Sequence, residues 1–138
     1  MTDRGWATLR RRTTWPLVAG DVLSFVFFSA LGHRSHDESN SLFSVLGTAA
    51  PFVVGWLAIA PWAGAFGAPS ERLVGDVLRR SAIAWLLAWP VCLLLRALAL
   101  RRGIPASFAL VALTANALLL LSWRSMFALY RRRKAMQC

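Results

Sequence analysis

The chain of 138 residues is long enough for one domain, and 57% of its residues are hydrophobic, with a mean hydropathy of +0.53. Soluble proteins average about 45–50% apolar residues, so the excess indicates a protein that faces lipid. A net charge of +10 would suggest nucleic acid in a soluble protein, but here the positive residues stand in short clusters between apolar runs, as at membrane boundaries. We therefore expect a single membrane domain over residues 1–138. Its partner is the lipid bilayer, and we expect no nucleic acid to bind.

Four apolar runs predict four transmembrane helices in an all-α, polytopic fold. A helix needs about 20 apolar residues to cross the hydrocarbon core. The runs cover about residues 15–31, 49–66, 81–100 and 105–130. Residues 1–14 and 131–138 remain as tails. We interpret the first run as an uncleaved helix rather than a signal peptide, because Asp21 lies inside its apolar part and three further runs follow.

The connections between the runs carry their own signals. Residues 42–48 are apolar but too few to cross alone, so we expect an extra short segment there, either interfacial or re-entrant. Pro90 stands in the middle of the third run, where a missing N–H should kink the helix. Gly103 and Pro105 form a turn signal. The third and fourth spans are therefore predicted to form an antiparallel hairpin.

The distribution of basic residues predicts the orientation of the chain. The two tails and the middle loop hold eleven Arg and Lys residues, whereas the other two loops hold three. Basic residues are retained on the cytoplasmic side of a membrane. We therefore expect a multi-pass protein of the cell's inner (cytoplasmic) membrane, with both termini cytoplasmic and the loop at residues 33–41 outside.

Two charged residues lie inside the spans at matching depth. Asp21 is six residues after Trp15. Arg124 is six residues before Tyr130, on a helix that runs in the opposite direction. Both should lie about 9 Å into the bilayer at 1.5 Å per residue. Because a guanidinium beside a carboxylate is the least costly way to hold either charge in lipid, we predict an ion pair.

Two alternatives to this ion pair stay open. In the first, Arg124 extends to the cytoplasmic headgroups, and Asp21 is protonated or meets water. In the second, Asp21 handles a proton or a substrate.

Two further polar residues are candidates for ligand contact or helix packing. Arg96 lies near the outer end of the third span, where its side chain can reach the headgroups. The alternatives are a pair with Asp37 or Glu38 and a site for an anionic ligand. Asn116 lies near the middle of the fourth span, where an amide requires a partner on another helix, and ligand binding is the alternative.

The first span leaves the membrane with the sequence HRSHDE, which raises the question of a metal site. His33 and His36 with Asp37 beside them could hold a divalent ion on a helix. The chain has no third histidine, and Cys92 and Cys138 are poorly placed to complete a site. We therefore predict no metal and no cofactor, and interpret these residues as outer-loop polar groups that cap helix ends.

Enzyme signatures are missing from the sequence. It contains no Gly-x-Ser-x-Gly, no His-Glu-x-x-His, no Walker loop and no paired intramembrane histidines for haem, so we assign no catalytic residue. Three functions stay open. The first is a small transporter or channel-like subunit for an unknown ion or small molecule, which forms a homo-oligomer because four helices barely enclose a pathway. The others are a structural or accessory membrane protein and, since scattered polar residues can form a site, an enzyme for a lipid-soluble substrate.

Several segments together resemble one family. They are GD (20–21), GHRSH (32–36), TAAPFVVGWLAIAP (48–61), WLLAWPVCLLLRAL (85–98), IPASFALVAL (104–113) and SWR (122–124). Over about residues 15–130 the chain resembles the small membrane proteins grouped as domain of unknown function 3054 (DUF3054). The resemblance implies a four-helix membrane protein and supplies no activity, so no functional residue is transferred.

Overall fold

Four long helices make up the described part of the chain. The computed structural model describes residues 3–35, 41–66 and 74–137, and these residues form helices and turns but no strand. The helices are α1 (Asp3–Ser35), α2 (Leu42–Ile59), α3 (Val74–Leu100) and α4 (Ala106–Met136). Each is long and apolar enough to cross a membrane. The chain is therefore an all-α, multi-pass membrane protein, as the sequence predicts.

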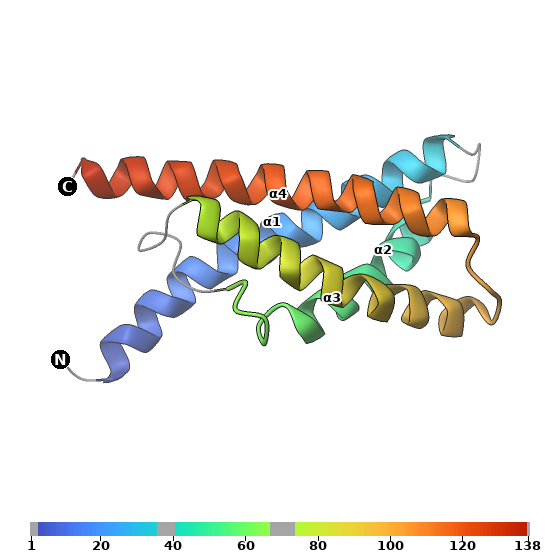
Figure 1. Cartoon of the computed structure of the whole chain (residues 1–138), viewed down its shortest axis with the longest axis horizontal. Helices are drawn as coiled ribbons and strands as arrows, with labels where there is room; N and C mark the ends of the chain where they lie inside the picture. The colour runs from blue at the N-terminus through green and yellow to red at the C-terminus, as the bar shows by residue number, and fades with distance from the viewer. Residues whose placement is uncertain (1–2, 36–40, 67–73, 138) are drawn as a thin grey trace.

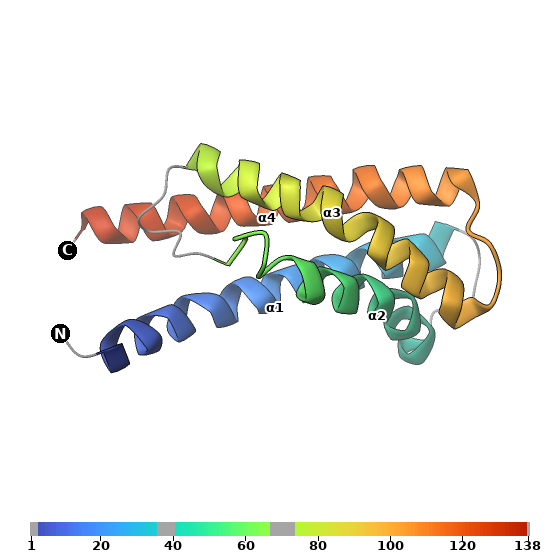
Figure 2. The ribbon, with the colours of Figure 1, turned by 60° about the horizontal axis from the view of Figure 1, so that its bottom comes forward.

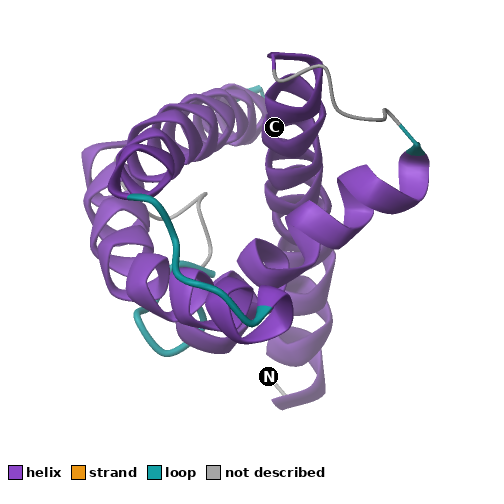
Figure 3. Ribbon diagram, turned by 90° about the vertical axis from the view of Figure 1, so that its right-hand side faces the viewer, coloured by secondary structure: helices purple, strands orange, loops and turns teal. Residues whose placement is uncertain are grey.

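The helices form an up-down-up-down bundle (Figure 1). Each helix packs against two neighbours, so that α1 and α3 both contact α2 and α4. The start of α1 and the end of α4 lie together at one end of the bundle, which we call the termini end (Figures 1 and 2). The opposite end, where α3 turns into α4, is the hairpin end. Figure 3 looks onto this hairpin end.

Helix α2 begins earlier and ends earlier than the sequence suggests. The side chain of Ser41 accepts a hydrogen bond from the backbone N–H of Ser44 at 3.2 Å and caps the helix, which then runs unbroken to Ile59. Residues 42–48, expected as a separate interfacial or re-entrant segment, are therefore the first turns of α2. Ala60 still has helical backbone angles, but the helix ends there because Pro61 has no backbone N–H to continue the hydrogen-bond ladder.

The chain folds back after α2. Ala65 donates a backbone hydrogen bond to Ala60 at 3.0 Å, and Gly64 takes a φ of 76°, which glycine adopts without strain. Residues 60–66 were expected to continue the second span, but they form this turn instead. The turn directs Ala65 and Phe66 back towards the bundle interior.

The other three helices also differ from the expected spans at their ends: α1 begins at Asp3 and α4 continues to Met136, so both run into residues that were expected as tails. Helix α3 starts at Val74, seven residues before the expected span, and Asp76 in its first turn has the negative charge that favours a helix N-terminus. The helix also continues through Pro90. It ends at Leu100, where Arg101 takes the left-handed conformation with φ 53° and α4 follows Pro105, which gives the predicted hairpin.

An aromatic cluster fills the interior between three helices. Phe25 of α1, Phe52 and Trp56 of α2 and Trp85 of α3 have ring centroids 5.7–6.3 Å apart. Offset and edge-on contacts at such distances stabilise aromatic pairs. The Trp85 indole N–H also donates to the backbone oxygen of Leu113 at 3.0 Å, which ties α4 to the cluster.

The outer surface is apolar as well. Each of the four helices has large apolar side chains that are exposed on the surface, where a soluble protein would bury most of them. Examples are Leu23, Val54, Leu94, Leu98, Leu118 and Met126. Such a surface suits contact with acyl chains.

Candidate functional site

The structure brings Asp21 and Arg124 into direct contact. The Arg124 Nε donates to Asp21 Oδ1 at 3.0 Å, and Nη2 donates to Oδ2 at 2.6 Å. Both side chains are 0% exposed. The contact is therefore a two-pronged, charge-assisted pair, the strongest geometry that a guanidinium and a carboxylate can adopt.

Every helix of the bundle contributes to this pair. Asp21 of α1 also accepts a hydrogen bond from the Trp56 indole N–H of α2 at 2.9 Å. Arg124 of α4 uses Nη1 to donate to the backbone oxygen of Ala65 at 2.7 Å and to Ser81 Oγ of α3 at 3.2 Å. Both carboxylate oxygens thus accept hydrogen bonds, and four of the five guanidinium N–H groups are used.

Two aromatic rings close over the guanidinium. Its Cζ lies 5.1 Å from the centroid of the Trp56 ring and 5.0 Å from that of Phe66. These are cation–π distances, and the attraction is stronger where water is excluded. Phe66 reaches this position only because the chain folds back after α2.

The close approach of α1 and α4 depends on a glycine beside the aspartate. A Cβ added to Gly20 would overlap the indole ring of Trp123. With glycine there, the ring lies directly against the backbone of α1. The small residue therefore allows the helix separation that a two-pronged contact between Asp21 and Arg124 requires.

A second polar layer lies in the bundle, nearer the hairpin end. Ser29 is eight residues after Asp21, and Asn116 is eight residues before Arg124, so both lie about 12 Å from the pair along their helices. Their side chains are 1% and 0% exposed. Asn116 was expected to bond to another helix, but its Nδ2 donates to Ala112 of its own helix at 3.0 Å.

The polar atoms of this second layer are incompletely bonded. Ser29 Oγ and Asn116 Oδ1 have no hydrogen-bond partner within residues 3–35, 41–66 and 74–137. A buried polar atom without a partner costs about 1–3 kcal/mol. The layer can therefore accept a water molecule or another hydrogen-bonding species.

The outer-loop and third-span candidates lie away from the ion pair. His33 was expected in the outer loop, but it lies in the last turn of α1 and is buried. Its Nε2 is 2.9 Å from Thr48 Oγ1, which joins the end of α1 to α2. Arg96 places its Cζ 4.5 Å from the centroid of the Phe108 ring on α4. His36, Asp37 and Glu38 lie outside the described residues. In the part that is described, no group of three His, Cys, Asp or Glu residues is placed to hold a metal ion.

Comparison with known proteins gives one match. None of the curated proteins and none of the solved structures matches this chain. A family model described as "Protein of unknown function (DUF3054)" matches residues 18–127, which contain both members of the ion pair and the second polar layer. Since the match covers most of the chain, this four-helix membrane protein belongs to the DUF3054 family.

Proposed function

We propose that the protein is a small transporter or channel-like subunit, and that its structure is a form closed at the Asp21–Arg124 pair. The observation that carries the proposal is this fully buried pair inside a bundle that crosses the membrane. Charged residues in membrane spans are costly, and they recur where ions, protons or substrates pass.

Further buried polar groups support a route along the bundle. Ser29 and Asn116 follow the pair at about 12 Å, and His33 lies about 18 Å from Asp21 along α1. All three side chains are buried. Polar groups therefore recur towards the hairpin end, although aromatic rings separate them in this closed form.

The turn after α2 is the natural gate of such a route. Arg124 holds it through the backbone oxygen of Ala65, and the Phe66 ring covers the guanidinium. If Arg124 releases Ala65, the pair becomes accessible from the termini end. The gate would then open by exchanging a protein hydrogen bond for one to water or substrate.

The proposal includes the orientation, the compartment and the assembly. The basic residues at the termini end support cytoplasmic termini in the inner membrane, which puts the gate on the cytoplasmic side. Because aromatic rings fill the interior of one bundle, a wider path would require a homo-oligomer. The substrate is an ion or a small molecule.

A structural or accessory role is the second candidate, and one observation favours it. Asp21 is completely bonded within the protein, by two donors on Arg124 and one on Trp56. A pair that only fixes the packing of four helices would have the same geometry. In that case the pair contributes to stability and not to flux.

Flux measurements on the reconstituted full chain distinguish the two. Proteoliposomes loaded with a pH-sensitive dye, under an imposed potassium diffusion potential, report proton flux, and sodium and potassium dyes report the other ions. We expect flux above that of protein-free liposomes, and we expect Asp21→Asn to abolish it. Ser24→Ala is the matched control, because Ser24 Oγ bonds the backbone oxygen of Gly20 in its own helix at 2.8 Å.

A second variant covers the case in which Asp21→Asn fails to fold. The double substitution Asp21→Asn with Arg124→Gln replaces the ion pair by a neutral amide pair, and circular dichroism checks its helix content. Under the transport proposal this double variant folds without flux. Wild-type protein without flux of any of the three ions would contradict transport of these ions, and a folded double variant with wild-type flux would contradict the role of the Asp21–Arg124 pair.

A further inference from the structure

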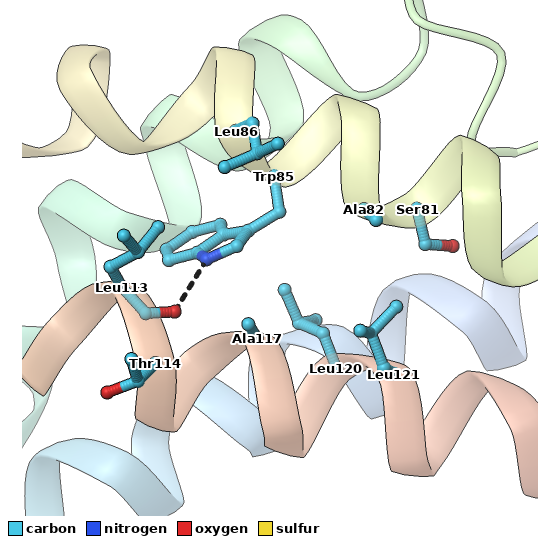
Figure 4. A pocket seen from close by; sticks show the side chains of 9 residues that line it. All are labelled: Ser81, Ala82, Trp85, Leu86, Leu113, Thr114, Ala117, Leu120 and Leu121. Carbon is cyan, nitrogen blue, oxygen red and sulfur yellow. Dashed lines mark hydrogen bonds between the residues drawn. The ribbon is translucent and has the colours of Figure 1, made fainter.

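A cavity opens on the outer face of the bundle between α3 and α4. Its volume is about 220 Å³. Figure 4 shows its lining, with Trp85 and Leu86 on the α3 side and Leu113, Thr114 and Ala117 on the α4 side. Leu86 is 59% exposed and Thr114 is also exposed, so the cavity is reached from the surface that faces lipid.

The walls of this cavity offer almost no polar group to a ligand. The Trp85 indole N–H is already bonded to Leu113. Thr114 Oγ1 donates to the backbone oxygens of Leu110 and Val111 of its own helix, at 2.9 and 3.3 Å. Ala82 and Ala117 also line the cavity, and their small side chains leave it open. An apolar cavity of roughly 150 Å³ is enough to bind a benzene ring, so this one has room for an aromatic-sized body.

Ser81 lies at one end of the lining (Figure 4), on the side of the ion pair. Ser81 lines the cavity and is 1% exposed, and its Oγ accepts a hydrogen bond from Arg124 Nη1 at 3.2 Å. Its hydroxyl proton is donated to no acceptor within the part of the chain that the structure describes. A ligand with an acceptor oxygen would accept a hydrogen bond from the Ser81 hydroxyl. Only the Ser81 side chain would then separate the ligand from the buried Asp21–Arg124 pair.

We propose that this cavity binds a quinone-type molecule, an uncharged ring with a carbonyl oxygen that accepts the Ser81 hydroxyl proton. The flat indole of Trp85 provides a wall for the ring, and an uncharged molecule can enter from lipid without losing a hydration shell. A phospholipid fits less well, because its ester carbonyls are tied to a headgroup at the membrane surface. The Asp21–Arg124 pair that Ser81 contacts is about 9 Å further into the bilayer, counted along the helices from Trp15 and Tyr130. The inference goes beyond transport, since binding is measured without flux.

The test is ligand binding to the purified full chain in detergent, with thermal unfolding as the measurement. Decylubiquinone is the probe, decylbenzene offers a ring without a carbonyl, and methyl decanoate offers an ester on a chain. We expect decylubiquinone to raise Tm by a few degrees at saturation and the other two compounds to raise it much less. No rise with decylubiquinone, or an equal rise with decylbenzene or methyl decanoate, would overturn the proposal.

Variants locate the site. Ala117→Phe fills the cavity and should remove the decylubiquinone shift, whereas Leu118→Phe, on an exposed position of the same helix, should keep it. Ser81→Ala should weaken the apparent affinity about tenfold, the equivalent of one hydrogen bond. If Ser81→Ala does not fold, the two phenylalanine variants still decide, because an unchanged shift in Ala117→Phe contradicts the site.

Discussion

At the scale of single residues, the buried pair depends on the shape of arginine as much as on its charge. Arg124 bonds three different partners in three directions: Asp21, Ala65 and Ser81. A lysine ammonium is a point charge that cannot reproduce this planar fork. The desolvation of both charges means that the pair as a whole adds little to stability, whereas breaking it is costly.

The pair should therefore show strong coupling in a double-mutant cycle. Asp21→Ala and Arg124→Ala should each lower the free energy of unfolding by about 3–5 kcal/mol, because each leaves an uncompensated charge in the bundle. The double variant should lose less than the sum of the two. Unfolding in detergent checks this, with Ser24→Ala as the control, and additive losses would contradict the ion pair.

The indole donors give a second prediction at this scale. Trp56→Phe removes the N–H that bonds the Asp21 carboxylate, and should cost about 1.5–3 kcal/mol, as for a hydrogen bond to a charged group. Trp89→Phe is the matched comparison, since its N–H donates to the neutral backbone oxygen of Ala109 at 3.1 Å. We expect Trp89→Phe to cost about 0.5–1.5 kcal/mol. The same unfolding assay measures both, and equal losses would mean that the charge on Asp21 does not strengthen its bond.

At the scale of the helices, α2 packs most tightly where it crosses α3. A Cβ on Gly55 would lie 2.5 Å from Cys92 Sγ and 3.1 Å from the Cys92 backbone. Gly47, on the same helix, has open space around it. The two glycines thus differ in environment but share one element.

Alanine substitutions at these two glycines should have opposite effects. Gly55→Ala should lower the free energy of unfolding by about 1–3 kcal/mol, because the added methyl forces α2 and α3 apart. Gly47→Ala should raise it by up to about 1 kcal/mol, the difference in helix propensity. Thermal unfolding followed by circular dichroism measures both. A stabilised Gly55→Ala variant would show that the two helices can separate without loss.

The helix boundaries show which elements a sequence can define. Hydropathy and length are sufficient for the number of spans, since each run must cross the same hydrocarbon thickness. They miss the start of α2, because Ser41 caps an apolar stretch that looks too short alone. They also miss its end, because residues 60–66 are as apolar as a span and yet form a turn, closed by the hydrogen bond from Ala65 to Ala60.

At the scale of the whole molecule, the sequence predicts how deep a residue lies in the membrane but not how each helix is rotated about its axis. Counting residues from the ends of two antiparallel spans gives Asp21 and Arg124 the same depth, and the structure holds them in contact. The other partners, Trp56, Ser81 and Ala65, depend on how each helix is rotated and on the turn after α2. These follow from packing among all four helices, which no local pattern encodes.

The orientation is testable on the same scale. Reporter fusions placed after Asp37 and after Lys134 should report opposite sides of the membrane, with the Lys134 fusion cytoplasmic, because an odd number of spans separates them. An alkaline phosphatase reporter is active outside the cytoplasm, and a fluorescent protein reporter is fluorescent inside it. The same side for both fusions would contradict the arrangement of the spans, and a reversed result would contradict the cytoplasmic termini.

The separation of the pair along the chain has a consequence for biosynthesis. Arg124 follows Asp21 by 103 residues, so a ribosome that adds about 5–20 residues per second needs roughly 5–20 s to supply the partner. Throughout that interval the first helix carries a carboxylate whose guanidinium has not yet been translated. The aspartate must therefore wait in the insertion machinery, at the headgroups or in the protonated form, and the bundle can close around it only when the last helix arrives.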